Sequence, residues 1–305
     1  MANKKNGGDI PSVNDERVLW VPIGCGKCME CRKQKTRQWQ VRLHEELKTN
    51  KNAHFVTYTF SDESLNDLEN EIKDLKGYEL DNEVCRLAVR RYTERWRKKY
   101  KRTLRHWLVT ELGTTSTERV HMHGIVWTNH KEDITKIWKY GGVYIGKFVS
   151  NQTINYIVKY LNKTDKKHKE YIPKMFVSKG IGSGYTIRKD SERNKYKKGD
   201  TCETYKTRKG LDLALPIYYR NKIYTEKERE ELWIEKLNEQ VRWVDGNKID
   251  ISKGDEEYYK VLEETRKKNK RLGYGDDSIN WERKHYEQQQ RNVKRMERIK
   301  KIYRK

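Results

Sequence analysis

The segment HMHGIVW, residues 121–127, places two histidines two positions apart within an apolar stretch of a polar chain. In a β-strand, successive side chains point to opposite faces, so His121 and His123 would project side by side while Met122 enters the core. Two imidazoles on one strand face form a two-point metal site. Such a pair also arises by chance, so it needs a third ligand before it predicts a metal.

The preceding stretch, RHWLVTELG, supplies a candidate for that ligand. If residues 105–113 and 119–129 are two strands of a hairpin joined by the polar linker TTSTE, Glu111 reaches the histidine pair. Two imidazoles and a carboxylate make a mixed nitrogen and oxygen site with open positions, suited to Mg²⁺ or Mn²⁺ acting on phosphate rather than to closed structural zinc. The alternative is that Glu111 is a strand-end carboxylate paired with a nearby arginine.

A tyrosine pair in NYIVKYLNK could supply the nucleophile. Tyr156 and Tyr160 are four residues apart, which puts them one turn apart on one face of a helix. Lys159 and Lys163 each follow a tyrosine by three residues, where a cation can lower the pKa of a phenol or neutralise a phosphate. A tyrosine oxygen that attacks a phosphodiester forms a phosphotyrosine linkage, and the second tyrosine could attack a second phosphodiester. The alternative is two aromatic side chains on the core side of an amphipathic helix.

Composition narrows the class of partner. The chain has 305 residues, a net charge of +23, 20 tyrosines and 9 tryptophans. A positive surplus of this size favours a polyanion through counterion release, and the aromatic side chains can stack on bases, so we expect nucleic acid binding. The alternative is that the charge serves solubility alone. No run approaches the length of a transmembrane helix and no signal peptide is apparent, so we expect a cytoplasmic protein that binds no membrane.

The elements that must position these residues follow from periodicity and residue type. Strands are predicted at 54–60, 105–113, 119–129 and 141–149, and helices at 32–50, about 81–100, 133–140 and 155–163. Asp81 or Asn82 is the predicted N-cap of the second helix, and Asn151 or Thr153 that of the fourth. An acidic insertion with little periodicity occupies 61–77. This irregular alternation predicts an α+β fold, an antiparallel sheet with helices on one face.

The second half of the chain shows weaker signals. Residues 224–242 read as an exposed helix of interleaved charges. The last 25 residues are strongly basic, and Val293, Met296 and Ile299 recur there at helical spacing. We expect a basic helix that docks weakly or becomes ordered on DNA, with disorder as the alternative.

Three of the five cysteines cluster in CGKCMEC. The odd number, the expected compartment and the tight spacing argue against a disulfide framework. The cluster offers three thiolates to a structural Zn²⁺, which prefers four ligands. The three are Cys25, Cys28 and Cys31. A fourth ligand could come from Cys85, Cys202 or His44. The alternatives are buried, small apolar cysteines or redox-active thiols.

These motifs, in this order, resemble those of the HUH endonuclease superfamily, named for its histidine–hydrophobe–histidine strand. Within it the chain looks most like the rolling-circle replication initiators of microviruses, especially the gokushovirus branch. FVTYTF (55–60) matches the first family motif, and TELG with HMHGIVW the second. YIVKYLNK matches the third, and CGKCMECR looks like the gokushovirus version of the N-terminal segment. The resemblance covers roughly residues 20–190.

The resemblance implies roles for the residues that match. Glu111, His121 and His123 would be metal ligands, Tyr156 and Tyr160 nucleophiles, and Lys159 and Lys163 supporting cations. The implied activity is a site-specific nick in single-stranded DNA at a phage origin, with a tyrosine joined to the 5′ phosphate and the freed 3′ hydroxyl priming a host polymerase. The second tyrosine would act on the regenerated origin, and strand transfer would close a circle.

The implied fold is a ferredoxin-like or RRM-like sheet. It predicts a flexible arm at 1–19, an endonuclease domain at 20–220 and a charged helical extension at 221–305. No Walker A string occurs, so unwinding would need a host helicase.

Two other functions remain open from the sequence. The chain could be an RRM-like single-strand nucleic-acid-binding protein without catalysis, in which the aromatic residues of FVTYTF stack bases and the histidine and tyrosine pairs are structural. It could also be a relaxase or transposase of the same superfamily. A binding protein needs neither tyrosine hydroxyl, whereas both enzyme classes do.

Overall fold

A computed structural model describes residues 15–19, 28–113, 118–163, 165, 167–208, 210–272 and 281–303 of the chain. Contacts divide the chain into two compact units. One comprises residues 1–41 and 183–277, the other residues 42–182 and 278–305. The boundary falls within helix α1, Met29–Thr49. Most of the predicted N-terminal arm lies outside the described residues, and the predicted ranges 20–220 and 221–305 stay predictions.

A five-stranded antiparallel sheet lies at the centre of the unit formed by residues 42–182 and 278–305. Its strand order is β4-β1-β3-β2-β5. The strands are β1 Ala53–Tyr58, β2 Arg105–Leu112, β3 Val120–Trp127, β4 Val143–Ile145 and β5 Met175–Val177. The predicted hairpin is β2 and β3, paired from Arg105 opposite Trp127 to Leu112 opposite Val120. The predicted α+β class with an antiparallel sheet is confirmed.

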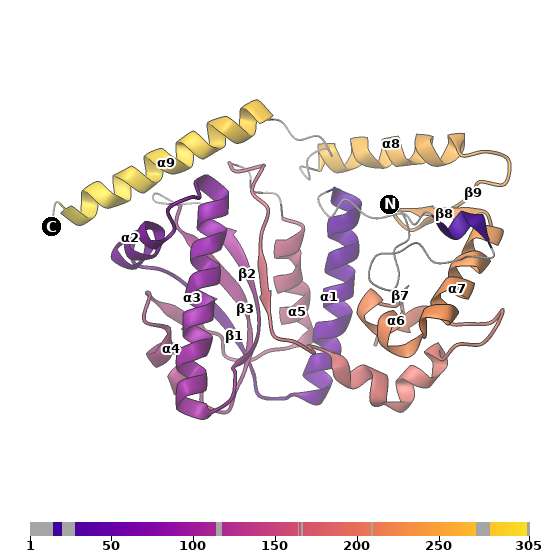
Figure 1. The fold of residues 1–305 in the computed structure, drawn as a ribbon, viewed down its shortest axis with the longest axis horizontal. Coiled ribbons are helices and arrows are strands. Elements are labelled where there is room, and N and C mark those ends of the chain that lie inside the picture. Colours follow the sequence, from indigo (N-terminus) through magenta and orange to yellow (C-terminus); the bar gives the residue numbers. More distant parts are fainter. Residues whose placement is uncertain are drawn as a thin grey trace. The chain divides into compact units, whose positions relative to one another are not determined.

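Helices cover both faces of this sheet. They are α2 Asp62–Glu71, α3 Gly77–Tyr100, α4 Lys131–Trp138, α5 Asn151–Val158 with the 3₁₀ turn η3 Lys159–Leu161, and α9 Trp281–Tyr303. Helices α2, α3 and α4 lie on one side of the sheet, and α5 lies on the other (Figure 1). Met122 is fully buried on the α3 side, as the strand alternation predicts.

Two elements differ from the sequence prediction. The acidic insertion forms α2, which Ser61 caps by accepting a hydrogen bond from the amide of Ser64. Its Leu65 and Leu68 are buried, so two apolar residues suffice to hold a helix whose other positions are polar. Helix α3 begins at Gly77 rather than after Asp81. The predicted cap was wrong because the Asp81 carboxylate is used inside the helix, where it pairs with an arginine of α9.

Helix α9 lies across α2 and α3 (Figure 1). It docks through charged side chains rather than through the apolar positions that the sequence singled out. Val293 and Met296 are about half exposed, whereas Arg291 and Arg298 are 4% exposed. Arg298 donates to the Glu69 carboxylate of α2 at 2.6 Å. The predicted basic helix therefore exists, but the side that docks is polar, because α2 and α3 present buried carboxylates to it.

The unit formed by residues 1–41 and 183–277 has its own small core. Tyr185, Tyr205 and Tyr219 are buried there with Leu232, among other residues. Its elements, besides the start of α1, are η2 Glu16–Leu19, η4 Ser183–Ile187, η5 Lys189–Asn194, β6 Thr204–Lys206, β7 Asp212–Ala214, α6 Ile217–Ile223, α7 Glu226–Asn238, β8 Val241–Val244, β9 Asn247–Asp250 and α8 Glu256–Arg271. The helix expected at 224–242 corresponds to α7, which Thr225 caps in a capping box with Glu228.

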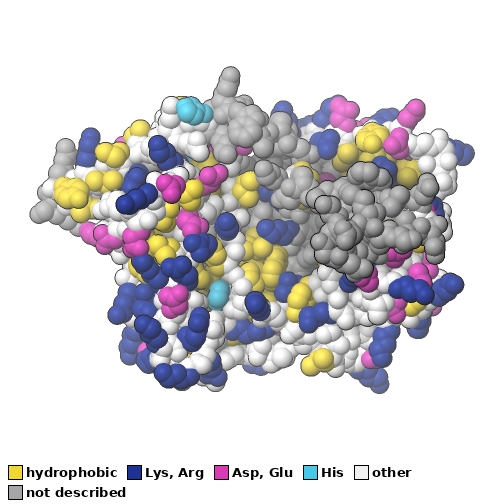
Figure 2. All heavy atoms as spheres, in the orientation of Figure 1, with side chains coloured by type: hydrophobic (Ala, Val, Ile, Leu, Met, Phe, Trp, Pro, Cys, Tyr) yellow, Lys and Arg dark blue, Asp and Glu magenta, His cyan; other side chains and the backbone are white. Residues whose placement is uncertain are grey.

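Basic side chains gather over the C-terminal part of α3 and over α4 (Figure 2). The last turn of α3 carries Arg97, Lys98 and Lys99. A patch of one sign attracts an anionic partner through its summed field. Among the described residues, no helix is both long enough and apolar enough to cross a membrane.

Candidate metal site and tyrosine pair

The sheet brings the predicted ligands onto one face. Glu111 of β2 lies directly opposite His121 of β3, and His123 lies opposite Val109. On its other side, His123 pairs with Thr57 of β1. Because side chains alternate along each strand, all of these project away from α3, toward the face that α5 covers.

Glu111, His121 and His123 converge closely. The Oε2 atom of Glu111 lies 3.2 Å from Nε2 of His121 and 2.9 Å from Nε2 of His123. Within the described part of the chain, this is the one group of three histidine, cysteine or acidic side chains whose ligand atoms lie within 4.8 Å of one another. The structure thus assembles in space the set that the sequence placed on two strands.

The second nitrogen of each imidazole contacts a further group. Nδ1 of His121 lies 3.3 Å from the backbone oxygen of Arg119, and Nδ1 of His123 lies 2.9 Å from the hydroxyl of Thr57. A carbonyl only accepts, so Nδ1 of His121 is the donor and, in the neutral ring, the lone pair on Nε2 faces the Glu111 carboxylate. Lone pairs that converge in this way suit a divalent cation, which is the chemistry predicted for the site.

The carboxylate of Glu111 is held in its ionised form. Burial alone would raise its pKa, but hydrogen bonds from His121, His123 and Lys163 outweigh burial and bring the pKa far below its ordinary value of 4.5. The Lys163 ammonium contacts Oε1, the oxygen that faces away from the histidines. Glu111 therefore pairs with a lysine and two histidines rather than with an arginine.

The tyrosine pair lies against these ligands. Ser150, not Asn151 or Thr153, caps α5, and Thr153 completes the capping box from inside the helix. The helix then tightens into η3 at Lys159–Leu161, which brings Tyr160 over His123 with ring centroids 4.6 Å apart and planes 15° apart. The hydroxyls of Tyr156 and Tyr160 lie 2.6 Å apart.

The two tyrosines differ in exposure. Tyr156 is 52% exposed, and Tyr160 is 8% exposed. Burial, the hydrogen bond with Tyr156 and the charge of Glu111 raise the pKa of Tyr160 above its ordinary value of 10.0. The Lys163 ammonium lies 5.5 Å from the centre of the Tyr160 ring, whereas Lys159 is exposed to solvent. The structure brings Lys163, but not Lys159, into contact with Glu111.

The predicted zinc ligands are only partly described. Cys25 lies outside the described residues, Cys28 and Cys31 lie at the start of α1, and Cys202 lies next to β6. Cys85 is completely buried in the core beside α3, and burial raises the pKa of its thiol. Among the described residues no second group with metal-ligand spacing is present. Zinc stays a prediction.

Sequence reasoning did not assign a role beside the metal ligands to Thr57 or Phe55. Thr57 orients His123. Phe55 stacks on His123 with centroids 6.3 Å apart, and its edge meets Tyr156 at 6.4 Å. Strand alternation within FVTYTF could have placed both side chains on the face opposite Val56 and Tyr58, but the pairing partner of β1 was needed to locate the histidines beside them.

Fold and site together define an α+β protein in which an imidazole and carboxylate cluster on a central hairpin adjoins a tyrosine pair. Residues 53–165, which contain the whole cluster and both tyrosines, match a family model of replication-associated proteins of the ORF2 kind. The chain is also similar to Replication-associated protein ORF2 of Spiroplasma virus 4, with 27% identity over 258 residues, which is 77% of this chain and 78% of that protein. No solved structure matches the chain significantly.

Proposed function

We propose that this protein is a metal-dependent DNA nicking and joining enzyme. In this proposal it cleaves single-stranded DNA at a specific site and initiates rolling-circle replication of a small circular single-stranded DNA phage genome. Two findings support it. The matched family and the Spiroplasma virus protein are both named as replication-associated, and the matched segment contains the site residues.

One observation carries the proposal: the nucleophile candidates contact the metal-ligand candidates directly. The Tyr160 ring stacks on His123, and its hydroxyl meets that of Tyr156. Two tyrosines in a merely structural role would have no need to place both hydroxyls beside three converging metal-ligand side chains. A phosphate held at Glu111, His121 and His123 would lie within reach of either phenol oxygen.

The proposed reaction is a transesterification. A tyrosine oxygen forms a bond to phosphorus, the bond from phosphorus to O3′ breaks, and the leaving oxygen takes up a proton to become a free 3′ hydroxyl. The phenol gives up its proton in the same step, so charge and atoms balance. The number of phosphate ester bonds is unchanged, and the later attack of a 3′ hydroxyl on the phosphotyrosine rejoins the strand.

The protein side chains divide the remaining work. Glu111, His121 and His123 would hold Mg²⁺ or Mn²⁺, which when bound polarises the scissile phosphate. Thr57 and the carbonyl of Arg119 fix the two imidazole rings. Lys163 sits where it can neutralise a phosphate oxygen. Lys159 would do so from the exposed end of α5.

A nicking assay tests the proposal. The protein is mixed with single-stranded oligonucleotides that tile the genome encoding it, with Mn²⁺ or with EDTA. We expect metal-dependent cleavage and a protein–DNA adduct that survives SDS. Tyr156→Phe and Tyr160→Phe should each retain part of the reaction, and the double variant should lose the adduct. Tyr286→Phe, an exposed tyrosine of α9, is the matched control.

Tight binding without cleavage on any oligonucleotide, under either metal, would contradict the proposal. The protein would then be the binding module considered from the sequence. Cleavage confined to an origin fragment of the phage genome would distinguish replication initiation from relaxase or transposase activity. In the proposed role, a host helicase unwinds the duplex and a host polymerase extends the 3′ hydroxyl.

A further inference from the structure

Two large aromatic side chains are exposed next to the candidate site. Tyr144 of the edge strand β4 is 62% exposed, and Phe148, in the segment between β4 and α5, is 74% exposed. Single exposed aromatic residues are ordinary on protein surfaces, so exposure alone indicates nothing. Their position relative to the metal ligands is what distinguishes these two.

Tyr144 faces the same way as the histidine pair. It pairs with Thr57 of β1, the residue whose hydroxyl contacts His123. Directly opposed residues in an antiparallel pair share a face, so Tyr144 extends the site by one strand. Its neighbours Val143 and Ile145 pack on the other side, against the core beside α3.

A row of rings connects Tyr144 to the site. The edge of Tyr144 meets Phe55 with centroids 6.4 Å apart, and Phe55 in turn stacks on His123 at 6.3 Å. Phe55 also contacts Tyr156 edge to face at 6.4 Å. A surface of aromatic faces and edges therefore runs from the tyrosine nucleophile candidates to the rim of the sheet.

Gly146 fixes this row in place. Its amide donates to the backbone oxygen of Phe55 at 2.9 Å, and a Cβ atom added at Gly146 would lie 3.2 Å from the Phe55 ring. The chain after β4 therefore packs tightly on Phe55, and Tyr144 stands on a strand held at both ends. A rigid aromatic side chain loses little entropy when a ligand stacks on it.

The charges around the row suit a phosphodiester strand. No acidic residue occurs between Asp133 and Asp165, although the chain has 45 of them. Lys147 lies between the two exposed aromatic residues and is itself exposed, and so is Lys159 beyond Tyr156. Aromatic side chains interleaved with cations are the usual surface for a single strand, because bases stack while phosphates meet lysines.

We propose that Tyr144 and Phe148 form a stacking surface for unpaired nucleobases of the strand whose phosphate lies at Glu111, His121 and His123. This inference rests on the proposed function and adds how the substrate is selected and aligned. Paired bases in a duplex do not offer their faces, so the surface accepts a single strand. A base stacked at Tyr144 sets which phosphodiester reaches the tyrosines.

Binding of a fluorescent single-stranded oligonucleotide, followed by anisotropy in EDTA, tests the surface without the reaction. We expect Tyr144→Ala and Phe148→Ala each to weaken binding about ten-fold, the loss of one base stack. Tyr144→Phe and Tyr144→Trp should bind as the parent does. Tyr286→Ala, which removes a tyrosine of similar exposure from α9, should leave affinity unchanged. Thermal unfolding of every variant checks that the fold is retained.

Oligonucleotides with one abasic position provide the second measurement. The parent protein should lose affinity when the base that stacks on Tyr144 is removed, and Tyr144→Ala should no longer distinguish that oligonucleotide from the intact one. Equal weakening by Tyr144→Ala and Tyr286→Ala, or an unchanged affinity of Tyr144→Ala, would overturn the proposal. If the parent never nicks but the abasic effect depends on Tyr144, the enzyme proposal fails and the stacking surface stands. If the parent nicks but shows no abasic effect that depends on Tyr144, the stacking surface fails and the enzyme proposal stands.

Discussion

Replacement of Arg291 by alanine tests how α9 is held on the rest of its unit. The Arg291 guanidinium is almost completely buried, and its Nε and Nη2 atoms donate to the two oxygens of Asp81 at 3.1 and 2.7 Å. Its Nη1 atom donates to the backbone oxygen of Glu118 at 2.7 Å. Asp81 is 6% exposed and Glu118 is 7% exposed, so neither acceptor reaches bulk water when the arginine is removed.

The expected loss follows from that burial. Removing one partner of a buried ion pair leaves an uncompensated charge and costs about 3–5 kcal/mol. The free energy of unfolding of a typical domain is about 5–15 kcal/mol, so Arg291→Ala should remove a large part of the stability of this unit. Replacing both partners, as in Arg291→Met with Asp81→Leu, removes the buried charge together with its partner and should cost much less.

Urea unfolding followed by tryptophan fluorescence measures the difference, and limited proteolysis reports whether α9 has come away. Arg295→Ala is the matched control, because Arg295 is partly exposed and Glu69 retains Arg298 as a second partner. A loss below about 1 kcal/mol for Arg291→Ala, or a double variant less stable than the single one, would refute the argument that a buried charge pair holds α9.

Three further changes have expected outcomes. Gly124→Ala should abolish folding or lower the free energy of unfolding by more than about 3 kcal/mol, because its Cβ would lie 2.1 Å from a backbone oxygen of β2; Gly142→Ala, whose nearest contact would be a hydroxyl 3.1 Å away, is the control, and equal stability of the two variants in urea would contradict the reasoning. Burial lowers the pKa of His106 below its ordinary value of 6.5, so the unfolded chain binds a proton that the folded chain does not, and stability should fall as pH drops below that value; His106→Asn, which keeps a donor for the carbonyl of Leu104, should flatten the dependence of the urea midpoint on pH, and an unchanged slope would exclude His106 as its source. Mn²⁺ at about 100 times its dissociation constant should stabilise the parent by about 2.7 kcal/mol; Glu111→Gln should show a much smaller rise in thermal midpoint, and an equal rise would move the metal elsewhere.

Strand alternation made the candidate site predictable from the sequence. Period-two patterning places His121 and His123 on one face, and the short connection between their strand and the preceding one makes Glu111 their neighbour. The tyrosine pair followed from helical spacing, because residues four apart share a face in an α-helix and remain neighbours when the last turn tightens. Local periodicity was enough wherever each residue lay on a regular element and its partner lay on the adjacent strand or turn.

Contacts between segments far apart in the sequence were beyond that reasoning. Asp81 fits the pattern of an N-cap, and only the arrival of Arg291, 210 residues later, explains why it lies inside a helix instead. The apolar spacing of Val293 and Met296 suggested the docking side of α9, yet both are about half exposed. Hydrophobic periodicity predicts a docking side only where the receiving surface is apolar, and the surface that α2 and α3 offer to α9 carries Glu69 and Asp81.

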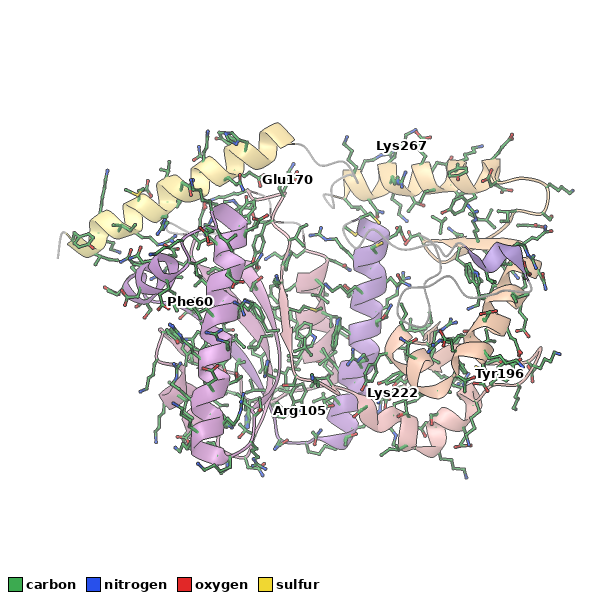
Figure 3. The ribbon with its side chains drawn as sticks, viewed as in Figure 1. Phe60, Arg105, Glu170, Tyr196, Lys222 and Lys267 are labelled. Atoms are coloured by element: carbon green, nitrogen blue, oxygen red, sulfur yellow. The ribbon has the colours of Figure 1, made fainter. Side chains whose placement is uncertain are left out.

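Docking by charged groups connects α9 to the metal-ligand candidates. Arg291 holds the carbonyl of Glu118, and the next carbonyl along the chain, that of Arg119, receives the hydrogen bond from His121. A second contact acts on the segment that follows the tyrosines: Glu287 of α9 accepts hydrogen bonds from the amides of Lys169 and Glu170, and Glu170 lies against the first turns of α9 (Figure 3).

The chain segments that enter and leave the site are therefore both tied to one helix more than 100 residues further along the sequence. An imidazole acts as a ligand only in the orientation that its second nitrogen sets, so a loop that moved at Glu118 would turn His121. The motif residues supply the chemistry of the candidate site, whereas α9 supplies part of the rigidity that holds them in register. This explains physically why the C-terminal helix docks through buried, directional ion pairs: a sliding apolar contact would leave the position of Glu118 undetermined.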